Sequence, residues 1–127
     1  KHLVVYNLHL ESRGPEKLRA LQLEEVIQDA DRYPATTPIV IAGDLNTKRR
    51  WSPCIELMRK SGFSDAIGDP ERFTTSRGGA LARLFIDGAL DWIWVRGPGH
   101  SDGKLHGDVR ASDHYPLSAV LGPNQAI

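Results

Sequence analysis

The chain has 127 residues, 40% of them hydrophobic and 25% charged, which excludes a disordered chain and leaves room for one modest domain. Its 16 basic residues balance its 16 acidic residues, so it lacks the overall basic excess that is typical of proteins that bind duplex nucleic acid. The single cysteine, Cys54, excludes an intrachain disulfide and favours a cytoplasmic location, and no apolar run is long enough to span a membrane.

The first third of the chain predicts a strand, a helix and a second strand. Residues 3–10 are rich in β-branched and aromatic side chains, which favours a strand. Pro15 stands where a helix begins, and the helix is expected to end before Pro34. Its apolar stripe consists of Leu18, Leu21, Val26, Ile27 and Ala30. The apolar run 38–42 predicts a strand covered on both faces, so the order is that of a crossover unit.

The rest of the chain predicts one helix and several short strands. Ser52 followed by Pro53 marks the start of the helix, and Gly62 marks its end. A turn is expected at residues 78–79, and a loop rich in glycine and aspartate is expected over residues 97–108. The predicted strands are residues 73–75, 89–95 and 116–121. Mixed strands and helices of this kind indicate a layered α/β (α+β) fold.

Four polar clusters lie at or beside the ends of predicted strands, where a rigid sheet presents side chains to a cleft. They are residues 7–11, 43–46, 90–93 and 112–117. Each cluster has a structural alternative when it is taken singly. A lone histidine is more often an exposed strand residue than a catalytic one, and the Gly-Asp-x-Asn pattern also forms an Asx turn that satisfies its own backbone.

Taken together, the clusters favour phosphoryl-transfer chemistry that is assisted by a hard cation. Carboxylate and carboxamide oxygens suit Mg²⁺, and an aspartate can orient and deprotonate a water. Asparagine can bind a phosphate oxygen, and a histidine held by a carboxylate can stabilise charge that develops on the phosphoryl group. Zinc is disfavoured because no close His/Cys ligand spacing is present. A Gly-x-x-x-x-Gly-Lys motif is absent as well.

The four clusters, in this order, resemble the motifs of the endonuclease/exonuclease/phosphatase superfamily, and the resemblance covers the chain nearly from end to end. It implies a DNase I-like fold and hydrolysis of phosphoester bonds. His9 is similar to the family histidine that contacts the scissile phosphate, and Asn7 in the same motif is assigned to substrate binding. In the Gly-Asp-x-Asn motif the resemblance makes Asp44 the residue that orients or activates the attacking water. Asn46 then holds phosphate oxygens.

The two later motifs complete the implied site. Asp91 resembles the aspartate that pairs with the final histidine, here His114, which acts as base or stabilises the phosphate. Asp113 resembles a group that is linked to the metal or acts as an acid, and Asp44 is the second expected metal-linked residue. The implied cofactor is Mg²⁺, with Mn²⁺ as an alternative.

The chain departs from the family in its length. Family catalytic domains are about twice as long, built as a two-sheet sandwich with helices outside. Residues 1–127 therefore correspond to the C-terminal portion of one such domain, half of a four-layered α/β sandwich with a mixed, mostly antiparallel sheet and flanking helices. The glutamate that is the family's main magnesium ligand belongs to the N-terminal half, so this chain alone is expected to bind Mg²⁺ poorly and to be inactive. The missing half, or a second copy of the chain, is the expected partner.

The sequence defines the substrate less closely than it defines the fold or the type of reaction. Arg49 and Trp51 follow Asn46 closely and are candidates for contacting a phosphate and stacking on a base, although an exposed charged surface explains them equally well. The inositol-phosphate subgroup is disfavoured because its signature is not found before Asp91. A nucleic acid is the preferred phosphoester substrate. The alternative function is a non-catalytic or incomplete scaffold that keeps the fold without turnover.

Overall fold

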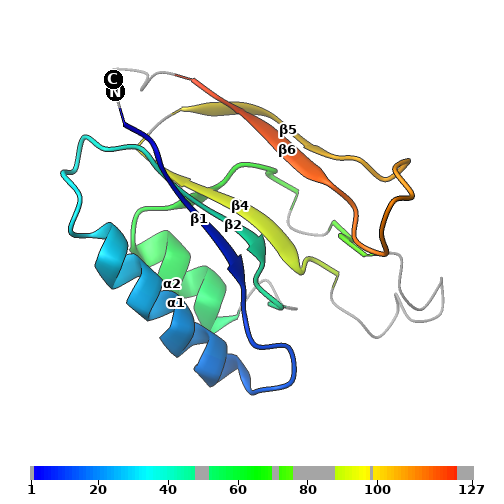
Figure 1. Cartoon of the computed structure of the whole chain (residues 1–127), viewed down its shortest axis with the longest axis horizontal. Helices are drawn as coiled ribbons and strands as arrows, with labels where there is room; N and C mark the ends of the chain where they lie inside the picture. Colours follow the sequence, from blue (N-terminus) through cyan, green and yellow to red (C-terminus); the bar gives the residue numbers. More distant parts are fainter. Residues whose placement is uncertain (1, 48–51, 70–71, 76–87, 98, 123–127) are drawn as a thin grey trace.

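A mixed four-stranded sheet with the strand order β1-β2-β4-β3 forms the centre of the structure (Figure 1). Its strands are β1 (Val4–His9), β2 (Ile39–Asp44), β3 (Ser64–Asp65) and β4 (Asp91–Arg96). β1 and β2 are parallel, whereas β4 is antiparallel to both β2 and β3. The computed structural model describes residues 2–47, 52–69, 72–75, 88–97 and 99–122. The strands predicted at 3–10, 38–42 and 89–95 are confirmed, with ends that differ by one or two residues.

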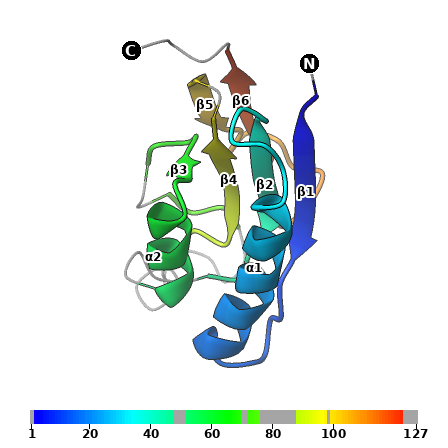
Figure 2. The same ribbon diagram turned by 90° about the vertical axis from the view of Figure 1, so that its left-hand side faces the viewer.

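Two helices cover one face of this sheet, as Figures 1 and 2 show. They are α1 (Glu16–Ala30) and α2 (Pro53–Lys60). α1 connects the two parallel strands, which confirms the predicted crossover unit. Ser52 caps α2 as predicted, because its side-chain oxygen accepts a hydrogen bond from the Cys54 backbone N–H at 3.1 Å.

The face of α1 that packs on the sheet agrees with the predicted stripe at Ile27 and Ala30 but differs from it in the first half of the helix. Leu18 and Leu21 are 40% and 49% exposed, whereas Leu23 is fully buried. Arg19 takes an inward position, where its guanidinium donates to the Glu11 carbonyl oxygen at 3.0 Å and its stem fills apolar space. A charged residue on the buried face therefore hides the true stripe from a count of apolar residues. The buried residues of α1 are Arg19, Leu23, Ile27 and Ala30.

A hairpin of β5 (His100–Leu105) and β6 (Leu117–Leu121) lies on the side of the sheet away from the helices (Figures 1 and 2). β6 confirms the strand predicted at 116–121. The loop predicted over residues 97–108 is wrong, because this segment contains β5. The pairing register shifts between Ser101 and Lys104, and Asp102 there has a φ of 53°. A bulge thus lets a segment with loop-like composition join a ladder.

The strand predicted at residues 73–75 is also wrong. Thr75 forms only an isolated bridge with His114, so this segment is an extended stretch with a single pairing contact. The turn predicted at residues 78–79 lies outside the described residues. No helix among the described residues is long and apolar enough to cross a membrane.

The two faces of the sheet are packed to different extents. On the helix side, Trp92 and Trp94 of β4 stack with ring centroids 5.2 Å apart inside the main core. The opposite face carries a small cluster of Val40, Ala66 and Val95, against which Ala119 of β6 packs. Val5 of β1 remains 58% exposed. One core is therefore closed beneath the helices, while the far face is only partly covered by the hairpin.

Candidate active site

Three of the predicted site residues lie side by side across the far face of the sheet. In the strand register, His9 is the partner of Asp44, and Asp44 is the partner of Asp91. Cα partners in neighbouring strands point to the same face, so their side chains form one row across β1, β2 and β4. The row lies at the last residue of β1 and β2 and the first residue of β4, where the sheet ends. We call these three residues the polar row.

Gly43 allows this end of the sheet to form. Its φ is 128°, a conformation that residues with a side chain rarely adopt. A Cβ atom built on Gly43 would meet the backbone oxygen of Leu8 at 2.0 Å. The absence of a side chain therefore lets β2 approach β1 directly before Asp44, which fixes where the Asp44 carboxylate stands.

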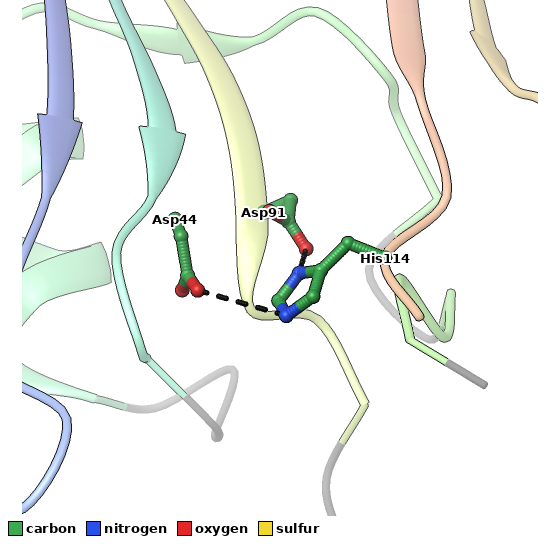
Figure 3. A group of neighbouring side chains, drawn as sticks. All are labelled: Asp44, Asp91 and His114. Atoms are coloured by element: carbon green, nitrogen blue, oxygen red, sulfur yellow. Dashed lines mark hydrogen bonds and ion pairs between the residues drawn. The ribbon is translucent and has the colours of Figure 1, made fainter. Parts of the chain in front are cut away.

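His114 reaches the polar row from the segment that precedes β6. Its Nδ1 lies 2.8 Å from Oδ2 of Asp91, as Figure 3 shows. An ionised carboxylate only accepts hydrogen bonds, so Nδ1–H donates and Nε2 is left to face outward. The side chains of His114 and Asp91 are 24% and 17% exposed. The pairing predicted for these two residues is thus present in the structure.

The two oxygens of Asp44 have different environments. Oδ1 accepts a hydrogen bond from the Asn46 backbone N–H at 2.9 Å, which is the Asx-turn contact. Oδ2 lies 3.8 Å from Nε2 of His9. It also lies 3.9 Å from Nε2 of His114, as Figure 3 shows. These distances are too long for direct hydrogen bonds and leave room for a bridging atom. The Asx turn is therefore present and uses Oδ1, while Oδ2 stays available for the role that the family resemblance implies.

The other predicted site residues are placed as follows. Asn7 is exposed on the same face as His9, two residues earlier in β1. Asn46 is buried, and its side-chain amide donates to the Leu10 carbonyl oxygen at 2.9 Å, which ties the end of β2 to the end of β1. Asp113 is exposed beside His114 and is not a member of the group formed by Asp44, Asp91 and His114. The substrate and metal roles of these residues remain predictions. Arg49 and Trp51 lie outside the described residues.

The donor atoms present, two carboxylates and one imidazole, form a possible site for a divalent cation. One potential ligand atom each from Asp44, Asp91 and His114 lies within 4.8 Å of the others. Mg²⁺ prefers oxygen and is commonly bound through one or two carboxylates with several waters. Because the Asp91 oxygen is engaged by His114, Asp44 is the carboxylate best placed to serve as a ligand.

Burial raises the pKa of the Asp91 carboxyl above its ordinary value of 3.8, although hydrogen bonds from Thr74 and His114 oppose the shift. The folded chain therefore binds this proton more tightly than the unfolded chain does. We expect the stability of the wild type relative to Asp91→Asn to fall as the pH rises from the unfolded pKa through the folded pKa, and then to level off. Urea denaturation of both proteins across the acidic range measures this difference. A difference that stays constant would contradict the expected shift.

Several known structures are similar to this chain over most of its length. The chain superposes on a functionally unknown conserved protein of Enterococcus faecalis with a TM-score of 0.71 and 21% identity, covering 94% of this chain and 50% of that one. It superposes on an endonuclease/exonuclease/phosphatase of Beutenbergia cavernae with a TM-score of 0.69 and 23% identity, covering 96% of this chain and 36% of that one. The chain has half of a DNase I-like fold. No protein-family model and no curated protein sequence matches it.

A third similar structure has a bound nucleic acid. It is TDP2 of D. rerio complexed with a single-stranded DNA product, with a TM-score of 0.63 and 20% identity, and the match covers 89% of this chain and 53% of that one. The chain thus spans about half or less of the length of these proteins. The mixed sheet with two helices on one face is the part of the DNase I-like fold that this chain supplies.

No sequence pattern indicated the residues that hydrogen bond to the segments carrying Asp91 and His114. Residues 73–75 were predicted as a strand, whereas side chains and backbone of the stretch 72–75 contact the segments that carry Asp91 and His114. The sequence of this stretch gives no signal for the role beyond two adjacent threonines, Thr74 and Thr75. Hydrogen bonds between segments so far apart in sequence leave no local pattern.

Proposed function

We propose that this chain supplies the acid–histidine part of the active site of a metal-dependent phosphoesterase. The observation that carries the proposal is the convergence of three side chains on one point. Asp44, Asp91 and His114 come from β2, β4 and the segment before β6, and Nδ1 of His114 is bonded to Asp91 at 2.8 Å. A histidine fixed by one carboxylate and facing a second one suits proton transfer and charge stabilisation at a phosphoryl group.

The proposed roles follow from the orientation of each group. Oδ2 of Asp44 orients a water toward phosphorus, because Oδ1 is already held by the Asn46 backbone. It takes a proton from the water as the water oxygen bonds to phosphorus. The bond from phosphorus to the leaving oxygen then breaks, and the leaving group departs as an alcohol after taking a proton from solvent. Nε2 of His114, in the protonated imidazole, donates to a phosphate oxygen, and Asp91 stabilises the imidazolium. His9, whose side chain is 74% exposed at the edge of the row, is free to contact the same phosphate.

A bound Mg²⁺ would neutralise negative charge on the phosphate oxygens. Asp44 is the proposed ligand from the polar row, and Asp113 is proposed as a second group linked to the metal. The ligand set supplied by this chain is small, which agrees with the proposal that the remaining half of the fold contributes further oxygens.

We propose a nucleic acid as the substrate class. The support comes from a similar structure, TDP2 of D. rerio, which is complexed with a single-stranded DNA product. Arg49 and Trp51 are proposed to contact phosphate and a base beside the polar row. A groove of 270 Å³ beside Asp91 has apolar walls that include Ile93 and Tyr115.

The proposed partner is the half of the fold that this chain does not contain. Val5 on β1 and Val120 on β6 are 58% and 55% exposed, so each of these strands leaves apolar surface that a partner could cover. Among the described residues, β1 pairs only with β2 and β6 pairs only with β5. Coverage of about half of the matched chains agrees with a missing half of similar size. A second copy of the chain is the alternative occupant.

The experiment joins this chain to the remaining half of the domain and measures hydrolysis of bis(p-nitrophenyl) phosphate and of a single-stranded oligonucleotide. We expect activity that EDTA abolishes and that added Mg²⁺ restores, since the cation neutralises the phosphate. The chain alone is expected to be much slower. Activity that ignores EDTA would contradict the metal-dependent proposal. Activity of the chain alone that rises with the square of its concentration would indicate that a second copy, and not the missing half, completes the site.

A further inference from the structure

One short segment contacts both members of the Asp91–His114 pair from behind. Residues 72–75 run between the start of β4 and the segment that precedes β6, and they hydrogen bond to both. We call residues 72–75 the clamp. Asp91 and His114 are 23 residues apart in sequence, so their alignment depends on contacts that join their two backbones.

Thr74 is the centre of the clamp and is fully buried. Its hydroxyl oxygen accepts hydrogen bonds from the backbone N–H groups of Leu90 and Asp91, at 3.0 and 3.1 Å. Its backbone carbonyl accepts from the N–H of Tyr115 at 2.8 Å. One residue thus bonds the backbone of Asp91 with its side chain and the backbone next to His114 with its main chain.

The residues on either side of Thr74 extend these contacts. The Thr75 hydroxyl donates to the Asp113 carbonyl oxygen at 2.8 Å. The Arg72 guanidinium donates to the Asp91 carbonyl oxygen at 3.3 Å and is itself held by the Asp65 carboxylate at 2.7 Å. Arg72 is only 4% exposed, so the clamp is anchored in the interior and not at the surface.

We propose that Thr74 is a positioning residue that keeps the His114 imidazole aligned with Asp91. This inference rests on the proposed function, in which Asp91 holds Nδ1–H so that Nε2 faces the substrate. The hydroxyl fixes the start of β4 and the carbonyl fixes the chain beside His114, so loss of the hydroxyl loosens one side of the pair. A buried acceptor that serves two N–H groups cannot be removed without leaving both of them unpaired.

The test compares Thr74→Val, which keeps the shape and removes the hydroxyl, with Thr74→Ser, which keeps the hydroxyl. The measurement is the nitrogen-15 and proton NMR spectrum of the His114 side chain in the full chain, at a pH where the imidazole is neutral. In the wild type we expect the proton on Nδ1, with a proton signal shifted downfield by the carboxylate. We expect Thr74→Val to lose this signal and to populate the other tautomer. Thr74→Ser should retain the signal.

Thr47→Val is the matched control. Thr47 is also fully buried, but its hydroxyl donates locally to the Leu45 carbonyl oxygen at 3.1 Å. We expect this variant to lose stability while the His114 signal stays unchanged. A folded Thr74→Val protein that keeps the signal, or a Thr74→Ser protein that loses it, would overturn the inference. If Thr74→Val does not fold, Thr75→Val replaces it: loss of the signal supports the clamp, and retention overturns it.

The readout separates this inference from the proposed function. The NMR signal is measured without substrate or metal, so it reports the alignment of His114 whether or not the protein is an enzyme. Absence of hydrolysis with the expected NMR pattern would reject the function alone. Hydrolysis with an unchanged signal in folded Thr74→Val would reject the clamp alone.

Discussion

Replacement of His114 by alanine is expected to lower kcat for phosphodiester hydrolysis by roughly a thousandfold in the joined domain, within the range that general acid–base groups contribute. The reason is that Nε2 of His114 donates to the reacting phosphate in the proposed site, where it lies 3.9 Å from Oδ2 of Asp44, the group that orients the water. KM should change much less, because substrate contacts elsewhere are retained. Steady-state hydrolysis of bis(p-nitrophenyl) phosphate at saturating Mg²⁺ measures both constants.

His106→Ala is the control for this variant. His106 precedes the same segment, and its Nε2 lies 2.7 Å from the Ser118 hydroxyl at the exposed surface of the hairpin. Its loss should leave kcat within a few fold of the wild type. Added imidazole should restore part of the activity of His114→Ala by occupying the vacated space. An unchanged kcat in His114→Ala would remove His114 from the mechanism.

Replacement of Gly43 by alanine is expected to destabilise the chain by about 3 kcal/mol or more. The added Cβ would lie 2.0 Å from the Leu8 carbonyl oxygen, and backbone cannot move aside as a flexible side chain does. The φ of 128° adds strain for any residue with a side chain. Urea denaturation followed by the fluorescence of the buried Trp92 and Trp94 measures the free energy of unfolding.

Gly68→Ala separates these two causes. Gly68 also has a positive φ, 75°, but a Cβ atom there would meet nothing within 4 Å. This variant should therefore lose only about 1 kcal/mol, the cost of the backbone conformation. If Gly43→Ala is no less stable than Gly68→Ala, the close approach of β2 to β1 does not constrain the sheet as we describe.

The strands and the polar row could be predicted because their signals are local. The run that ends in Asp44 and the run that begins at Asp91 are apolar segments with a carboxylate at one end, and this pattern is visible without any knowledge of the fold. The assignment of Asp91 to His114 depended instead on the family resemblance, since no periodicity joins residues that far apart. The structure confirms that pairing at 2.8 Å.

The wrong predictions share one cause: the structure of each residue concerned depends on hydrogen bonds that a count of apolar or loop-forming residues does not show. β5 was missed because Asp102 and its neighbours have loop-like composition, and a bulge let them pair. Arg19 was missed as a buried residue because its partners are carbonyl oxygens of the β1–α1 loop, which apolar counting ignores. Thr74 was missed because its role lies in bonds to Leu90, Asp91 and Tyr115 that only the folded chain brings together.

The closed core beneath the helices has a consequence for how a complete domain would assemble. Trp92, Trp94 and their neighbours are packed without any contribution from the far face of the sheet. The helix-side core therefore keeps the sheet, and with it the far face, ordered. A polypeptide that covers the far face would bind an ordered surface, so this chain would not have to fold during the binding. For this chain, such an association has the character of docking onto a preformed surface, with a negative heat-capacity change from the apolar area and a small cost of ordering this chain.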